Sequence, residues 1–102
     1  MVEEINGLEQ LEQVVQNNEA VIVDVWAAWC GPCRMIAPIV EAVANENSNI
    51  KVVKVDADVN KDVMQQFGIR SIPTLLYFKN GALADKTVGA VAKNTILEKI
   101  KI

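Results

Sequence analysis

The decisive stretch of the sequence is Trp29-Cys30-Gly31-Pro32-Cys33, which contains both cysteines of the 102-residue chain. An apolar run typical of a strand precedes it at residues 20–26. A pattern with apolar residues at spacings of three and four, typical of a helix, follows it. Pro32 suits the first position of that helix, because its missing N–H would have no partner there. The two thiols are therefore predicted on a turn that leads from a strand into a helix N-terminus.

This placement of the cysteines favours redox chemistry. The unpaired N–H groups and the dipole of a helix N-terminus stabilise a thiolate and lower its pKa. A second thiol three positions further on can attack the first sulfur and close a ring. The pair therefore has the properties of a dithiol/disulfide exchanger.

Three other interpretations of the cysteine pair are weaker. A purely structural disulfide across so short a loop stabilises a fold by only about 2 kcal/mol. Half of a zinc site would need further ligands, and the chain contains no His and no third Cys. Two inert, buried thiols are disfavoured because the intervening Gly31 and Pro32 indicate an exposed turn.

Composition narrows the class of protein. A chain of 102 residues with half its residues hydrophobic predicts one globular domain, residues 1–102. The net charge of −3 and the lack of a basic run disfavour a nucleic-acid partner. The sequence shows neither a secretory signal nor an apolar run of membrane-spanning length. We therefore expect a cytoplasmic monomer that binds no metal and no membrane, in a compartment where paired cysteines are more often catalytic than structural.

The remaining pattern predicts the element order βαβαβαββα. A strand is expected at residues 2–5, followed by a helix that Asn6 caps, and a long helix is expected from Cys33 to about Asn47 with a kink at Pro38. Asn80-Gly81 between two apolar runs predicts a β-hairpin. Further strands are expected at residues 51–56, 74–78 and 83–88, with a short helix between Asn60 and Gly68 and a last helix containing Ile96, Leu97 and Ile100. Parallel crossover units followed by a hairpin predict an α/β fold with a central mixed sheet and helices on both faces.

Asp24 lies within the apolar strand and is the carboxyl most suited to proton transfer. Burial would raise its pKa, so that it can accept a proton from Cys33. The alternative is a carboxyl at the strand end that meets solvent or a helix N-terminus, and the residues alone leave both open. Lys54, in the next strand, either pairs with Asp24 or is an ordinary solvated lysine.

The segment from Trp26 to Cys33 resembles the active-site signature of the thioredoxin family. The resemblance extends to Asp24 and Lys54 and to residues 68–75, 78–81 and 88–90, so it runs nearly from end to end. It implies a thioredoxin fold and a general protein-disulfide reductase. In that activity Cys30 would attack a substrate disulfide and Cys33 would resolve the mixed disulfide.

The same resemblance implies roles for the partners and the surrounding residues. Proteins with accessible disulfides would be the substrates, and a flavoprotein, thioredoxin reductase, would return electrons from NADPH, with no cofactor bound to this chain. Asp24 would take the proton of Cys33, with Lys54 beside it. Pro73 would be cis, and the backbone of Ile72 would pair with an extended substrate segment. The docking rim would consist of Trp29, Gly31, Pro32, Ile72, Gly89 and Ala90.

Two classes of function remain at this stage. Gly31 and Pro32 place no cation between the cysteines, which favours a reductant over an oxidase or isomerase of the same fold. The alternative is a binding or scaffold subunit of this fold in which the thiols are not required.

Overall fold

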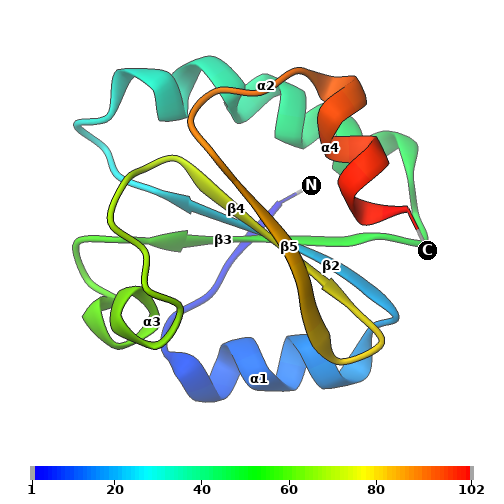
Figure 1. Cartoon of the computed structure of the whole chain (residues 1–102), viewed down its shortest axis with the longest axis horizontal. Helices are drawn as coiled ribbons and strands as arrows, with labels where there is room; N and C mark the ends of the chain where they lie inside the picture. Colours follow the sequence, from blue (N-terminus) through cyan, green and yellow to red (C-terminus); the bar gives the residue numbers. More distant parts are fainter. Residues whose placement is uncertain (1, 102) are drawn as a thin grey trace.

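A five-stranded mixed sheet forms the centre of the structure, a computed structural model that describes residues 2–101 (Figure 1). The strands lie in the order β1-β3-β2-β4-β5. β2 pairs in parallel with β3 and antiparallel with β4. At the two edges, β1 pairs in parallel with β3, and β5 pairs antiparallel with β4. The elements are β1 (Glu3–Glu4), α1 (Leu8–Asn17), β2 (Ala20–Trp26), α2 (Gly31–Glu46), β3 (Lys51–Asp56), α3 (Lys61–Gln66), β4 (Thr74–Lys79), β5 (Ala82–Val88) and α4 (Lys93–Ile100).

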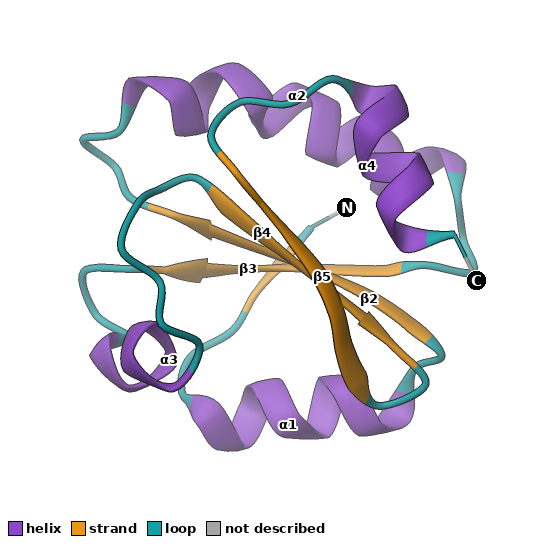
Figure 2. Ribbon diagram, viewed as in Figure 1, coloured by secondary structure: helices purple, strands orange, loops and turns teal. Residues whose placement is uncertain are grey.

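Helices cover both faces of this sheet, as the sequence predicts. α2 and α4 lie over one face, and α1 and α3 lie over the other (Figure 2). The order βαβαβαββα and the mixed sheet are thus confirmed. β2 occupies the middle of the sheet, which explains why nearly all of its side chains are buried.

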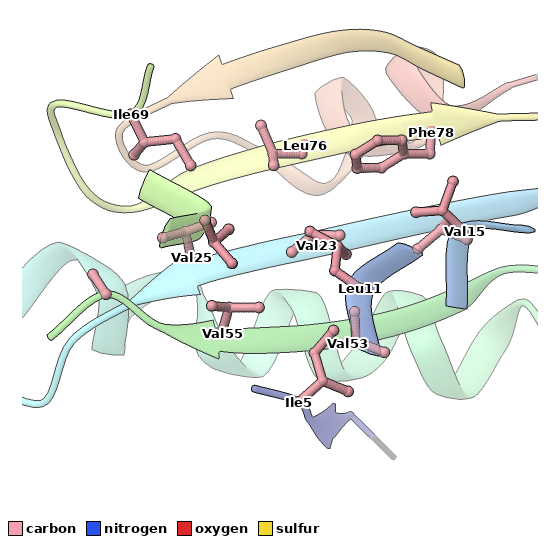
Figure 3. Close-up of a cluster of buried hydrophobic side chains, with 13 residues drawn as sticks. Ile5, Leu11, Val15, Val23, Val25, Val53, Val55, Ile69, Leu76 and Phe78 are labelled. Carbon is pink, nitrogen blue, oxygen red and sulfur yellow. The ribbon is translucent and has the colours of Figure 1, made fainter. Parts of the chain in front are cut away.

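The alternation of side chains along β2 divides the core into two clusters, one on each face of the sheet. Val21, Val23 and Val25 face α1 and α3 and pack with residues such as Leu11 and Phe78 (Figure 3). The even-numbered residues face the other way, where Ile22 packs in a cluster that includes residues of α2 and α4. Asp24 belongs to this second set, so the strand period directs its carboxyl towards α2.

Local signals set most element ends. Asn80 and Gly81 both have positive φ angles, of 52° and 85°, as the predicted two-residue hairpin turn requires. Gly68, with φ of 60°, follows α3 as the sequence predicts, and α1 ends at Asn17. α2 continues through Pro38 as one helix to Glu46.

Two predicted helix starts differ by one residue. Gly7, not Asn6, is the N-cap residue of α1, because the side chain of Asn6 instead accepts a hydrogen bond from Asn60. Cys30 is the N-cap residue of α2, so Pro32 lies at the second helical position rather than the first. The first difference accompanies a contact with a residue far along the chain, and the second accompanies the local hydrogen bond from the N–H of Cys33 to the Cys30 sulfur.

Candidate active site

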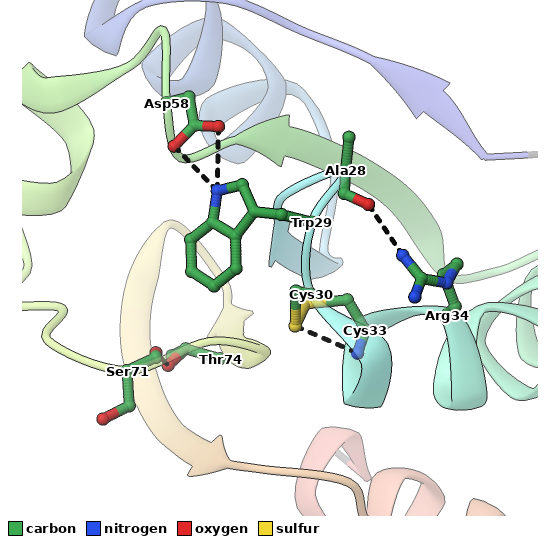
Figure 4. The surroundings of a disulfide bond; sticks show 8 residues. All are labelled: Ala28, Trp29, Cys30, Cys33, Arg34, Asp58, Ser71 and Thr74. Atoms are coloured by element: carbon green, nitrogen blue, oxygen red, sulfur yellow. Dashed lines mark hydrogen bonds between the residues drawn. A yellow bond between two sulfur atoms is a disulfide. The ribbon is translucent and has the colours of Figure 1, made fainter.

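A disulfide joins Cys30 and Cys33 at the N-terminus of α2, just beyond the carboxyl end of β2 (Figure 4). The backbone N–H of Cys33 donates a hydrogen bond to Sγ of Cys30, with 3.1 Å between the nitrogen and the sulfur. After reduction, the same N–H and the positive end of the helix dipole would lie beside the Cys30 sulfur. This is the environment that lowers a thiol pKa.

The two cysteine side chains are less exposed than the turn that carries them. Cys30 and Cys33 are each 4% exposed, and they pack with Ala27, Trp26 and Ile72. The exposed turn expected at Gly31 and Pro32 is present, but the cysteine side chains on either side of it are buried. Pro32 is exposed, but tertiary contacts from the strand and from the loop before β4 cover most of the sulfur surface.

Asp24 is buried beneath this turn, with only 5% of its surface exposed. Burial raises its pKa from 3.8 to about 6, against the opposing effect of the positive charge of Lys54. Its Oδ1 atom is buried and has no hydrogen-bond partner within residues 2–101. The alternative of a solvent-facing carboxyl at the strand end is therefore wrong. The group can change its protonation state close to neutral pH.

Lys54 lies beside Asp24 in the sheet, where the two residues are register partners of β3 and β2. Its Nζ atom lies 5.2 Å from the ring centroid of Trp26, a cation–π distance. The ammonium is thus held over the indole while its charge still favours the ionised form of Asp24. This geometry lies between the two alternatives left open by the sequence.

A cavity of about 250 Å³ connects the buried carboxyl with the second sulfur. Asp24, Cys33, Lys54 and Trp26 are among its lining residues. The indole Nε1 of Trp26 is buried and also without a hydrogen-bond partner in the part of the chain that the structure describes. The cavity therefore brings Asp24, Trp26 and Cys33 together, and its volume is large enough for water.

A second loop approaches the disulfide from β4. The Ile72–Pro73 peptide bond is cis, as the resemblance implied, and Ile72 packs against the cysteine pair. The N–H of Gly89 donates to the carbonyl of Pro73 over 2.8 Å, which ties the end of β5 to this loop. Gly89 has φ of 86°, and Ala90 after it is exposed. The fold thus assembles the predicted rim from three separate segments of the chain.

No role near the disulfide was predicted from the sequence for Arg34, Asp58 or Asn60. The indole Nε1 of Trp29, a side chain that is 68% exposed, donates to the carboxylate of Asp58 over 3.0 Å. Nη1 of Arg34 donates to the carbonyl of Ala28 over 2.7 Å. Asn60, only 2% exposed, bonds to the carbonyl of Asp56 and accepts from the N–H of Gly7. For Asp58 and Asn60, the one sequence signal of a place near the site is that they follow the carboxyl end of a parallel strand.

Comparison with known proteins places this site in a family. The family model described as Thioredoxin matches residues 2–102. The chain belongs to the thioredoxin family. It is 52% identical to "Thioredoxin 1" of Synechococcus elongatus over 86 residues, which are 83% of this chain and 80% of that protein. It is 46% identical to "Thioredoxin M-type, chloroplastic" of Pisum sativum, over 98% of this chain and 59% of that protein.

Solved structures agree with the family membership. A mutant thioredoxin from Halobacterium salinarum superposes with a TM-score of 0.91 at 33% identity, over 97% of this chain and 87% of that chain. Thioredoxin relatives are thiol-disulfide oxidoreductases, and this chain has the Cys-x-x-Cys pair, joined in a disulfide, in the same position. Each helix described within residues 2–101 is too short or too polar to cross a lipid bilayer.

Proposed function

We propose that this thioredoxin acts as a general reductant of protein disulfides, with Cys30 as the attacking thiolate. The observation that supports this role most directly is the helix N-terminal N–H that points at the Cys30 sulfur. In the reduced protein that thiolate attacks a substrate disulfide, forms a mixed disulfide and releases one substrate thiolate. No cation lies between the cysteines at Gly31 or Pro32, so the reduced state is not over-stabilised and the pair remains a good electron donor.

Cys33 completes the exchange. Its thiolate attacks the Cys30 sulfur of the mixed disulfide, which forms the Cys30–Cys33 bond and releases the second substrate thiolate. Two electrons have then passed from the dithiol to the substrate. Asp24 accepts the proton of Cys33 through water in the shared cavity, and its raised pKa makes it a base suited to neutral pH. Lys54 keeps part of the carboxyl population ionised.

Substrates would dock on the exposed rim around the disulfide. The backbone of Ile72 beside the cis Pro73 pairs with an extended segment of the substrate, and this binds peptides with little dependence on sequence. Trp29 and Ala90 are exposed, and Gly89 is held against Pro73 by a hydrogen bond. Gly31 and Pro32 complete the rim at the start of α2.

The electrons would be restored by a thioredoxin reductase that draws on NADPH, so the chain itself needs no bound cofactor. We further propose that residues 1–102 work as one domain and as a monomer in the cytoplasm. The single continuous sheet supports the one-domain proposal. The reducing chemistry of the pair suits a compartment that keeps thiols reduced.

Insulin reduction, coupled to NADPH through a thioredoxin reductase, tests this function. The unaltered chain should reduce insulin, Cys30→Ser should be inactive, and Cys33→Ser should accumulate a mixed disulfide visible on a non-reducing gel. Lys86→Gln, on the exposed face of β5, is the matched control and should keep full activity. A Cys30→Ser variant with full biological effect would instead support the binding or scaffold alternative.

A further inference from the structure

Arg34 lies one residue after Cys33 in α2, and its side chain turns back across the turn that precedes the disulfide. Nη1 donates to the carbonyl oxygen of Ala28 over 2.7 Å, and this bond joins the first turn of α2 to the segment between β2 and α2 (Figure 4). The bond contributes nothing to the docking rim described above. It has no assigned role in the exchange reaction.

Both residues that this bond joins, Ala28 and Arg34, line the cavity that contains Asp24. Among the lining residues, Asp24, Ala27 and Cys33 are buried, whereas Ala28, Arg34 and Ala37 are exposed. The exposed residues mark the end of the cavity that opens to solvent. The hydrogen bond between Arg34 and Ala28 therefore joins two lining residues at this exposed end of the cavity.

We propose that Arg34 is a positioning residue that closes this opening and limits the access of bulk water to Asp24. The inference rests on the proton transfer from Cys33 to Asp24 proposed above. It adds a side chain, that of Arg34, which sets the solvation of the proton acceptor. With the opening closed, the carboxyl stays poorly solvated and keeps its raised pKa. With the opening free, bulk water solvates the carboxylate and returns its pKa towards the ordinary value.

A direct effect of the Arg34 charge would act with the opposite sign. The groups around Asp24 are Lys54 from β3, the uncharged Leu75 from β4, and Cys33 and Arg34 from α2. The positive charge that lowers the pKa of Asp24 is that of Lys54. The side chain of Arg34 is exposed, so solvent screens its charge. Loss of a nearby cation would raise the pKa of Asp24, whereas loss of a closure lowers it, so the direction of the shift separates the two explanations.

Two measurements on Arg34→Ala test the closure. In the first, carbon-13 NMR follows the side-chain carboxyl of Asp24 in the oxidised protein as pH is varied, with the signal assigned by its loss in Asp24→Asn. In the second, stopped-flow absorbance follows the reduced protein with 5,5′-dithiobis(2-nitrobenzoate). The attack of Cys30 releases one thionitrobenzoate, and the attack of Cys33 on the mixed disulfide releases a second.

The expected result is a fall of roughly one pH unit in the midpoint of the Asp24 titration. The pH midpoint of the second thionitrobenzoate release should fall with it, while the first release is unchanged. Arg34→Met, which keeps a long side chain and a good helix former but removes the donor, should shift both midpoints in the same direction. Lys86→Gln removes an exposed cation that does not line the cavity and should shift neither.

The outcomes separate this inference from the function on which it rests. An NMR midpoint that stays fixed or rises in both Arg34 variants would overturn the closure, whatever the kinetics show. A lower NMR midpoint with an unmoved second release would support the closure and reject Asp24 as the proton acceptor. Absence of any thionitrobenzoate release from the unaltered protein would reject the proposed function, and the NMR titration would still decide the role of Arg34.

Discussion

Replacement of Asp24 by Asn should remove a pH-dependent cost from the stability of the fold. The pKa of Asp24 is about 6 in the folded protein and 3.8 as the unperturbed value, a difference of about two units. Each unit corresponds to about 1.4 kcal/mol, so the ionised carboxylate destabilises the folded state by about 3 kcal/mol relative to the neutral acid.

The raised pKa of Asp24 determines how the unfolding free energy changes with pH and over which pH range. Between pH 3.8 and about 6 the folded state binds more protons at Asp24 than the unfolded state does. The stabilisation by the neutral acid is thus complete below pH 3.8 and is lost as pH rises through about 6. Asn cannot ionise, so the gain in unfolding free energy from Asp24→Asn should be larger at pH 8 than at pH 4 by about 2.5 kcal/mol.

Urea unfolding of the oxidised protein at these two pH values, followed by far-ultraviolet circular dichroism, measures the effect. The quantity compared is the difference between variant and unaltered protein at each pH, so that the other carboxyl groups cancel. Asp85→Asn is a control of opposite sign, because the hydrogen bond from Lys99 lowers the pKa of Asp85 and its ionised form stabilises the fold at pH 8. An Asp24→Asn gain that is equal at both pH values would refute the reasoning.

Three further predictions concern single contacts. Leu76→Ala, at a fully buried position of β4, should lower the unfolding free energy by about 2–5 kcal/mol in a denaturant titration, and a loss below about 1 kcal/mol would contradict the packing described. Gly81→Ala should cost about 1–2 kcal/mol in the same assay because its φ is 85°, and a neutral result would show that the turn can rearrange. Asp58→Ala frees the indole of Trp29, so KM for a protein disulfide should rise roughly two- to tenfold at unchanged kcat, and an unaltered KM would exclude a role for this bond in docking.

Features set by local chemistry could be predicted from the sequence. The Asn80-Gly81 hairpin needs only residues that tolerate positive φ. The apolar run around Asp24 left a buried and a solvent-facing carboxyl both open, and the position of β2 in the middle of the sheet decides for burial. The cis bond before Pro73 followed from the family resemblance, because periodicity carries no information on peptide isomers.

Features that depend on distant contacts could not be predicted. Trp29 and Asp58 are 29 residues apart, and their hydrogen bond exists only because β2 and β3 end at the same edge of the sheet. The burial of the two sulfurs likewise depends on Ile72 from a loop about forty residues further along the chain. The start of α1 was displaced by one residue because Asn6 bonds to Asn60.

The buried amide of Asn60 gives the N-terminal segment an influence on the active-site rim. Its Oδ1 holds the N–H of Gly7, and its Nδ2 holds the carbonyl of Asp56, at the base of the loop that carries Asp58. The partner of the Trp29 indole is thus anchored, through one side chain, to a residue more than fifty positions earlier in the chain. Trimming the first seven residues, or fusing a bulky tag closely against them, would therefore loosen the loop that carries Asp58, the partner of Trp29, without touching either cysteine.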